Sequence, residues 1–197
     1  MSASIYDPAA ITAVILAGGG GTRMGGVDKA LLLWRGRPFI EHSSERLRPQ
    51  VAAVIVNSDR ADAYPALQLP IVGDAGPQRR GPLAGVLAAL GASTTPFTLV
   101  VPCDCPLPSP QLAQRLYDAL YAEQADLAYA VTGTDEHYLF ALRSTALRDN
   151  LRAHLAEPGN GAVRRWYAGL RCARVYFDDQ PECFVNINSP TDFGRLP

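Results

Sequence analysis

The sequence predicts an α/β fold of three layers, in which a mostly parallel central sheet lies between two layers of helices. Strand-like and helix-like patterns alternate along the chain, and this alternation is typical of that architecture. Several strand-like segments are continuous apolar runs, as expected for strands of a parallel sheet with both faces buried. Three helical segments begin with a proline, which is favoured in the first turn of a helix.

The individual elements follow from these patterns in order along the chain. The helix at 82–90 shows the pattern clearly, because Leu83, Val86 and Leu90 recur at helical spacing on one stripe. A further helix starts after the cap Ser109. Strands are expected at residues 12–16, 53–57, 70–72, 98–102, 127–131, 139–142 and 172–177, and the other helices at 38–47, 145–156 and 162–170.

Length and composition limit the kind of protein. The 197 residues suit a single domain over residues 1–197, whose first ten residues are expected to be flexible. A formal net charge of −1 gives no overall basic field that would attract nucleic acid, so we expect no nucleic-acid partner. The N-terminal segment lacks a basic region followed by a long apolar core, so we expect no membrane association and a cytoplasmic location. The four cysteines lack the spacing of a zinc site and are expected to be thiols that fill apolar space.

The segment most informative about function follows the first expected strand. It reads Leu16-Ala-Gly-Gly-Gly-Gly-Thr-Arg-Met-Gly-Gly-Val-Asp-Lys29. Four consecutive glycines leave no Cβ in the turn, so backbone N–H groups can approach an anion closely. Arg23 and Lys29 add two cations near the turn, and a polyphosphate-binding loop is therefore predicted. A flexible glycine loop without a ligand would need neither cation.

Two common glycine-rich phosphate loops do not fit this segment. A Walker A loop ends in Gly-Lys-Ser/Thr, whereas Lys29 stands between Asp28 and Ala30. A dinucleotide fingerprint needs glycines at positions i, i+2 and i+5, a spacing that the glycines between Gly18 and Gly26 do not have. The loop therefore belongs to neither class.

Polar residues follow the ends of several expected strands. Asn57 ends one strand, Asp74 follows the next, and Asp104 follows the apolar run at 98–102. Because ligands of open α/β sheets bind outside the carboxyl ends of the strands, we expect these side chains and the glycine loop at one edge. Each residue alone has a simpler role in a turn or cap, but the combination favours a site. A carboxylate that faces bound phosphates suits Mg²⁺, so Asp104 is the predicted metal ligand of a nucleoside triphosphate site.

Several blocks of the sequence carry a resemblance that covers nearly the whole chain. They are Leu16-Ala-Gly-Gly, Arg23-Met-Gly-Gly, Asp28-Lys29, Gly81-Pro-Leu-Ala-Gly85, Pro102-Cys-Asp104 and Phe184-Val-Asn-Ile-Asn-Ser-Pro190. Together these blocks resemble one enzyme family, the molybdenum cofactor guanylyltransferases. The resemblance implies a Rossmann-like nucleotidyltransferase fold and transfer of GMP from GTP to molybdenum-molybdopterin, which yields molybdopterin guanine dinucleotide and pyrophosphate. Proteins that deliver molybdopterin, and molybdoenzyme-maturation proteins that receive the product, are implied as further partners.

The resemblance also assigns roles to single residues. It implies that Asp104 binds Mg²⁺ and that Asn186 and Asn188 lie on the metal or molybdopterin side, with backbone bonding at a strand end as their alternative role. Arg23 joins Lys29 and Asp104 as a catalytic residue on charge grounds, since these groups would reduce the repulsion between two anionic substrates. The GTP contacts that the family implies are Leu16, Ala17, Gly18, Lys29, Asn57, Asp74 and Asp104.

The sequence offers candidates for the residues that recognise the guanine base and for the loop beside the molybdopterin acceptor. Guanine presents N–H donors, so Asp74 and the loop at 81–85 are candidates for recognising the base, and Gly18 would leave room for a purine. The family often has His-Pro where this chain has His137-Tyr138, and this departure concerns the loop on the acceptor side.

Two other functions are compatible with parts of the sequence. A cytidylyltransferase or sugar-phosphate nucleotidyltransferase would share the glycine-rich block, and a comparison of GTP and CTP affinities separates it from a guanylyltransferase. A GTP-binding module without catalysis would share the loop, and pyrophosphate release in the presence of the acceptor excludes it. A structural scaffold would not explain Asp104 beside the loop.

Overall fold

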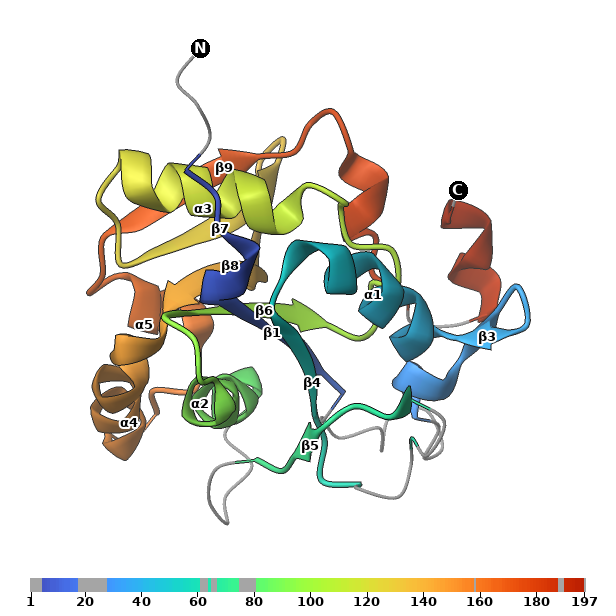
Figure 1. Ribbon diagram of the computed structural model, residues 1–197, viewed down its shortest axis with the longest axis horizontal. Helices are drawn as coiled ribbons and strands as arrows, with labels where there is room; N and C mark the ends of the chain where they lie inside the picture. The colour runs from blue at the N-terminus through green and yellow to red at the C-terminus, as the bar shows by residue number, and fades with distance from the viewer. Residues whose placement is uncertain are drawn as a thin grey trace.

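The computed structural model describes residues 5–17, 28–60, 64, 67–74, 81–157, 159–187 and 190–196. Its centre is a seven-stranded sheet with the strand order β5-β4-β1-β6-β8-β7-β9 (Figure 1). The strands are β1 (Ile11–Leu16), β4 (Ala53–Asn57), β5 (Ile71–Val72), β6 (Phe97–Pro102), β7 (Leu127–Thr132), β8 (Asp135–Ser144) and β9 (Cys172–Tyr176).

Parallel pairing dominates this sheet. β1 pairs in parallel with β4 and β6, β4 with β5, and β7 with β9. β8 is the exception, because it lies antiparallel between β6 and β7. The prediction of a mostly parallel sheet is confirmed, and each expected strand is present. The largest difference in bounds is at β8, which begins at Asp135 rather than at residue 139.

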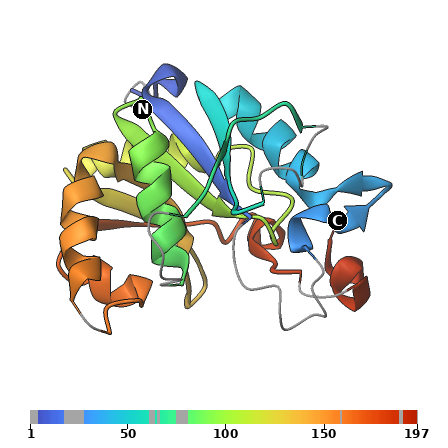
Figure 2. The same ribbon diagram turned by 90° about the horizontal axis from the view of Figure 1, so that it is seen from below.

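Helices cover both faces of the sheet (Figure 1 and Figure 2). α1 (Phe39–Leu47) and α3 (Leu112–Ala122) pack on one face, whereas α2 (Pro82–Ala92), α4 (Arg148–Ala156) and α5 (Val163–Tyr167) pack on the other. The three expected layers are therefore present. Short 3-10 helices occur at Pro8–Ala10, Lys29–Leu31 (η3), Arg48–Gln50, Thr145–Leu147, Pro181–Phe184 and Pro190–Arg195 (η9).

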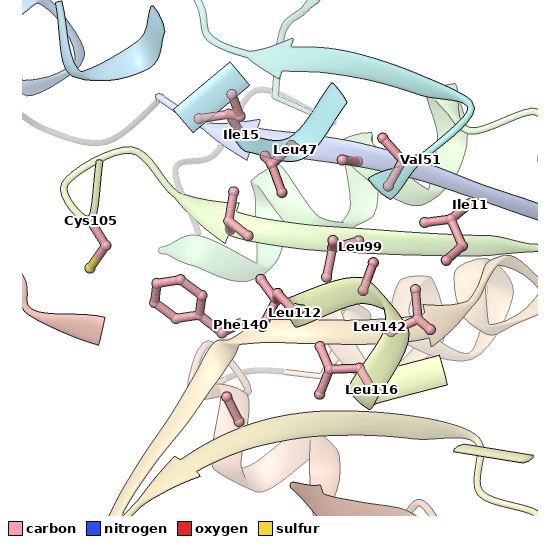
Figure 3. Packing of buried hydrophobic residues seen from close by; sticks show 14 of the residues in the cluster. Ile11, Ile15, Leu47, Val51, Leu99, Cys105, Leu112, Leu116, Phe140 and Leu142 are labelled. Atoms are coloured by element: carbon pink, nitrogen blue, oxygen red, sulfur yellow. The ribbon is translucent and has the colours of Figure 1, made fainter. Parts of the chain in front are cut away.

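Each face of the sheet has its own hydrophobic cluster. Successive residues of β6 point to opposite faces, so that Leu99 lies in the cluster under α1 and α3 and Val100 in the cluster under α2, α4 and α5. Figure 3 shows Leu99 packed near Leu112 and Leu116 of α3. Burial on both faces explains why the strand is apolar at every position instead of at alternate ones.

The sequence pattern does not indicate a short hairpin that precedes α1. Its strands β2 (Leu33–Trp34) and β3 (Arg37–Pro38) are antiparallel and too short to show alternation. Arg35 and Gly36 connect them with φ angles of 50° and 77°, as a two-residue type I′ turn requires. Pro38 consequently ends β3 and caps α1, instead of lying in the first turn of the helix as expected.

The two ends of the described chain pack in different places. Near the N-terminus, the Asp7 side chain caps the 3-10 helix Pro8–Ala10. The flexibility of the first ten residues stays a prediction. At the other end, Phe193 of η9 packs on Phe39 of α1, with ring centroids 5.7 Å apart. Within the described ranges, none of the helices has the length and apolar character needed to span a membrane.

Candidate active site

Three neighbouring strands, β4, β1 and β6, bring their carboxyl ends to one edge of the sheet. Leu16 at the end of β1 is paired with Asn57 on one side and with Pro102 on the other. Beyond these pairs, the Ala17 N–H donates to the Asn57 carbonyl at 2.9 Å, and the Cys103 N–H donates to the Leu16 carbonyl at 3.1 Å. The loops after the three strands therefore leave the sheet side by side, as expected for a ligand site of an α/β fold.

Lys29 and Asp104, far apart in the sequence, form an ion pair at this edge. The Lys29 Nζ lies 3.3 Å from Asp104 Oδ2, and the two side chains are 30% and 17% exposed. A pair this accessible to solvent contributes about 1 kcal/mol or less to stability. Its importance therefore lies in its position at the strand ends, where it forms the centre of the candidate site.

A carboxylate beside Lys29 fixes the backbone that carries it. Asp28 caps the 3-10 helix η3 by accepting a hydrogen bond from the Ala30 N–H at 3.0 Å. Its other oxygen accepts a hydrogen bond from the Tyr64 hydroxyl at 2.8 Å and lies 3.5 Å from the Arg60 guanidinium. This supporting role was not assigned by the sequence analysis, although the preference of aspartate for helix N-caps is a signal for it.

Asn57 and Asp74 form a second pair next to the first. The Asn57 Nδ2 donates to Asp74 Oδ1 at 3.1 Å and to the Val72 carbonyl at 3.2 Å. Asn57 is buried, so these bonds and the surrounding packing fix its orientation. The Asp74 backbone N–H donates to Asp59 Oδ1 at 3.1 Å. The structure thus brings together two of the residues that the family resemblance places on the GTP side.

Two glycines of the block at 81–85 let helix α2 begin close to Asn57. A Cβ at Gly85 would lie 2.4 Å from Asn57 Oδ1 and 3.1 Å from Leu16 Cδ2, and a 2.4 Å contact is closer than nonbonded atoms allow. Gly81, just before the helix, has a φ of 65°, which disfavours any side chain. The block therefore has a packing role beside Asn57, which the spacing of its residues alone does not indicate.

Replacing Gly85 with alanine is expected to displace the Asn57 side chain and weaken nucleotide binding. Because Asn57 is buried and bonded to β5, the overpacking is expected to cost about 1–3 kcal/mol of stability. The matched control is Gly91→Ala in the same helix, where the nearest atom to an added Cβ is Nε of the Arg148 side chain, at 3.4 Å. Thermal denaturation and GTP titration calorimetry measure both effects. Equal GTP affinity in the two variants would contradict this role of Gly85.

The Phe184 block lies on the other side of Asp104. The Ile187 N–H donates to the Asp104 carbonyl at 2.8 Å. The Cys105 thiol donates to the Phe184 carbonyl at a sulfur–oxygen distance of 3.8 Å. Asn186, which precedes Ile187, is exposed. The structure therefore places Asn186 next to a residue bonded to Asp104, and its role on the metal or molybdopterin side stays a prediction.

His137 of β8 supports this block from the neighbouring strand. Its ring stacks on Phe184, with ring centroids 4.8 Å apart and planes inclined by 26°. Its Nε2 lies 2.7 Å from the Thr132 hydroxyl oxygen. Burial lowers the pKa of His137 below its usual value of 6.5, although the nearby Asp135 acts in the opposite direction. The neutral imidazole is therefore the favoured form in the folded protein.

The fold is expected to lose stability as the pH falls through about 6.5, in part because of His137. The unfolded chain takes up a proton on this residue at a higher pH than the folded chain does, so acidification favours unfolding. His137→Gln removes this proton uptake and is expected to flatten the dependence between about pH 5.5 and 7.5, above the range in which carboxylates titrate. Urea denaturation at several pH values measures the slope, and an unchanged slope in the variant would refute the assignment.

The cysteines on either side of Asp104 are packing residues. Cys103 and Cys105 are buried free thiols, and burial raises the pKa of both well above its usual range. Figure 3 shows the Cys105 side chain near Phe140 at the edge of the hydrophobic cluster. Cys183 is buried as well. The prediction that thiols fill apolar space is therefore confirmed for these cysteines.

Gly18, Arg23 and Asn188 lie outside the described residues, and so does the glycine-rich stretch at 18–27. The functional roles of the predicted residues stay predictions. The predicted residues that the structure brings to one edge of the sheet are Leu16, Ala17, Lys29, Asn57, Asp74 and Asp104.

Comparison with known proteins agrees with this fold and identifies the class of protein as a nucleotidyltransferase. A family model described as a MobA-like NTP transferase domain matches residues 13–175. The chain is 41% identical over 187 residues to the molybdenum cofactor guanylyltransferase of Shewanella loihica, covering 94% of this chain and 95% of the relative. It is 43% identical to the molybdenum cofactor guanylyltransferase of Shewanella amazonensis, with the same coverage of both chains. The chain belongs to the MobA-like NTP transferase family.

A solved structure shows the same fold. Molybdopterin-guanine dinucleotide biosynthesis protein A from Archaeoglobus fulgidus superposes with a TM-score of 0.73 at 21% sequence identity. The match covers 93% of this chain and 95% of that chain. The prediction of a Rossmann-like nucleotidyltransferase fold is therefore confirmed.

Proposed function

We propose that this chain transfers GMP from GTP to molybdenum-molybdopterin, forming molybdopterin guanine dinucleotide and releasing pyrophosphate. The observation that carries the proposal is the Lys29–Asp104 pair at the carboxyl edge of the sheet, beside the Asn57–Asp74 pair. Membership of the MobA-like NTP transferase family, with relatives named molybdenum cofactor guanylyltransferase, supports this choice of substrates.

Mg²⁺ is the proposed metal, with Asp104 as its protein ligand. In the part of the chain that the structure describes, no group of three or more His, Cys, Asp or Glu side chains could hold a metal. The single carboxylate of Asp104 fits Mg²⁺, because this metal takes one or two carboxylates from the protein and completes its shell with phosphate oxygens and water. The Asp104 carboxylate pairs with the Lys29 ammonium and is 17% exposed, so it is in contact with solvent from which a cation can approach. The metal would supply charge neutralisation at the triphosphate.

The main difficulty of the proposed reaction is to bring two anions together. The acceptor is a phosphate monoester whose second pKa is about 6, so it is already a nucleophile at neutral pH and needs no general base. Lys29, held by the turn that Asp28 caps, is available to pair with the triphosphate and to stabilise the leaving pyrophosphate. Arg23 is proposed to add a second cation. Catalysis then consists of positioning and electrostatic stabilisation.

The nucleotide is proposed to lie over β1, β4 and β5. Asn57 ends β4, and Asp74 follows β5 at the edge of the sheet. A carboxylate accepts hydrogen bonds from the N–H groups of guanine, so Asp74 is the candidate for base recognition. The other proposed GTP contacts are Leu16, Ala17, Gly18, Lys29 and Asp104.

The acceptor is proposed to lie on the opposite side of Asp104, near the Phe184 block. Asn186 and Asn188 are its candidate contacts. Proteins that deliver molybdopterin or receive the dinucleotide are proposed as partners. A cytoplasmic place of action is proposed as well, and it is supported by free cysteines, which are typical of a reducing compartment.

Pyrophosphate release with a panel of nucleotides tests the proposed function. We expect release from GTP only when the molybdopterin acceptor is present, with loss on chelation of divalent metal and recovery on addition of Mg²⁺. Faster release from CTP would overturn the choice of guanine and favour a cytidylyltransferase. GTP binding without pyrophosphate release would instead identify a binding module.

A further inference from the structure

Arg143 of β8 is a buried cation that has no acidic partner among the residues that the structure describes. Its side chain is fully buried. One guanidinium nitrogen donates to the Ala141 carbonyl at 3.0 Å, and another donates to the Tyr138 carbonyl at 2.9 Å and to the Tyr167 hydroxyl. Over the described ranges no carboxylate pairs with it, and its Nε has no hydrogen-bond partner there. Burial of an uncompensated charge is unfavourable, so the arrangement needs a structural reason.

That reason is a bulge in β8. Ala141 lies opposite Tyr129 of β7, and the next pair along the strands joins His137 to Ala130. One step along β7 therefore corresponds to four steps along β8, and residues 138–140 have no partner in β7. Backbone groups in such a bulge lose their place in the ladder and need other hydrogen-bond partners.

Arg143 supplies these partners from inside the fold. The Tyr138 carbonyl, within the bulge, accepts hydrogen bonds from Arg143 and, at 2.8 Å, from the Tyr167 hydroxyl. Burial raises the pKa of Tyr167 to about 12, so this hydroxyl stays protonated and can donate while accepting from Arg143. The guanidinium and the hydroxyl thus hold the same carbonyl and fix the shape of the bulge.

The bulge lies beside the strand that leads to Asp104. β6 pairs with β8 only as far as Val100 opposite Ala141, so the bulge begins where this pairing ends. Phe140 in the bulge packs on Phe184 with ring centroids 4.9 Å apart, next to the His137 ring that stacks on the same residue. Phe184 begins the block whose Ile187 N–H is bonded to the Asp104 carbonyl. A continuous set of contacts therefore joins Arg143 to the backbone of Asp104.

We propose that Arg143 is a positioning residue for the acceptor side of the site. By fixing the bulge of β8 it places His137 and Phe140, and through them the Phe184 block beside Asp104. The inference rests on the proposed function. Most of the proposed nucleotide contacts lie at β1, β4 and β5, so we place the acceptor on the β8 side of β6. Asp104 is also a proposed nucleotide contact, but the Ile187 N–H of the Phe184 block bonds to its backbone carbonyl, which leaves the carboxylate for the metal. Loss of Arg143 is therefore expected to affect mainly the acceptor and to leave GTP binding nearly unchanged.

Steady-state kinetics with Arg143→Met test the proposal, since methionine fills space but donates no hydrogen bond. We expect the KM for the acceptor to rise by roughly tenfold to a hundredfold, as misplaced reacting groups produce, with the GTP affinity unchanged. Arg143→Lys restores donors to the carbonyls and is expected to recover part of the loss. The matched control is Arg152→Met, which removes an exposed arginine of α4. An equal loss of GTP affinity, or an unchanged acceptor KM, would overturn the proposal.

Tyr167→Phe provides a second test of the proposal. If Arg143→Met does not fold, Tyr167→Phe removes the other donor to the Tyr138 carbonyl, and a smaller rise of the acceptor KM is expected. An unchanged acceptor KM in that variant would overturn the proposal.

The imidazole NMR signals of His137 report on the bulge without any substrate. We expect them to move toward those of an unstacked histidine in Arg143→Met or Tyr167→Phe but not in Arg152→Met, and unchanged signals would refute the link between Arg143 and the bulge. A wild-type protein that releases no pyrophosphate would refute the proposed function instead.

Discussion

Replacement of Asp104 with asparagine is expected to abolish nucleotidyl transfer while leaving the fold intact. Asparagine keeps the shape of the side chain but removes the charge that pairs with Lys29 and that would hold Mg²⁺. Loss of the metal ligand is expected to lower the turnover rate by a factor on the order of 10² to 10³. Pyrophosphate release as a function of Mg²⁺ concentration measures the loss.

A matched variant shows whether the effect is local. Asp149→Asn removes an exposed carboxylate whose side chain is 84% accessible and which pairs with Arg152 in the same helix. We expect wild-type turnover in that variant and unchanged thermal denaturation in both. Turnover close to wild type in Asp104→Asn at ordinary Mg²⁺ concentrations would show that another residue holds the metal.

Lys29→Ala is expected to weaken GTP binding and to slow the reaction, because it removes a cation from the triphosphate side of the site. The pair with Asp104 is partly exposed, so its loss is expected to change the stability by about 1 kcal/mol or less. A large fall in activity with little change in melting temperature is therefore the expected signature. GTP titration calorimetry and single-turnover kinetics measure the two effects separately.

Lys29→Arg tests what kind of cation the site needs. It keeps the charge, but a planar guanidinium can hold Asp104 through two hydrogen bonds and compete with the metal. We expect this variant to bind GTP better than Lys29→Ala and to turn over more slowly than the wild type. Unchanged kinetics in Lys29→Ala would remove Lys29 from the list of phosphate contacts.

Local patterns are enough to predict the strands that form the centre of the fold. The expected strand at 53–57 coincides with β4 (Ala53–Asn57), because its apolar residues are buried on both sides. The polar residues at the strand ends follow from the same patterns, since carboxyl ends of parallel strands meet at one edge. The strand pattern alone is therefore enough to place Asn57 and Asp104 at one edge of the sheet.

Features that depend on contacts between distant segments could not be predicted in this way. The chain order does not reveal that β8 inserts between β6 and β7. In the bulge of β8, the Tyr138 carbonyl accepts hydrogen bonds from Arg143 and from Tyr167, which lies 24 residues beyond Arg143 in the chain. Likewise, the need for glycine at position 85 appears only when Asn57 is found against it.

The cation that pairs with Asp104 is a lysine, in a chain whose other basic side chains at neutral pH are arginines. Lys29 is the only lysine among the 18 lysine and arginine residues of the chain. A compact ammonium on a flexible stem can exchange one anionic partner for another more readily than a guanidinium, which binds through a rigid planar fork. Apart from the N-terminal amine, the site therefore holds the only primary amine of the sequence. Amine-selective chemistry would therefore label Lys29 as the single side chain, besides the N-terminus, and protection of Lys29 from labelling would report how much of the protein has its substrate bound.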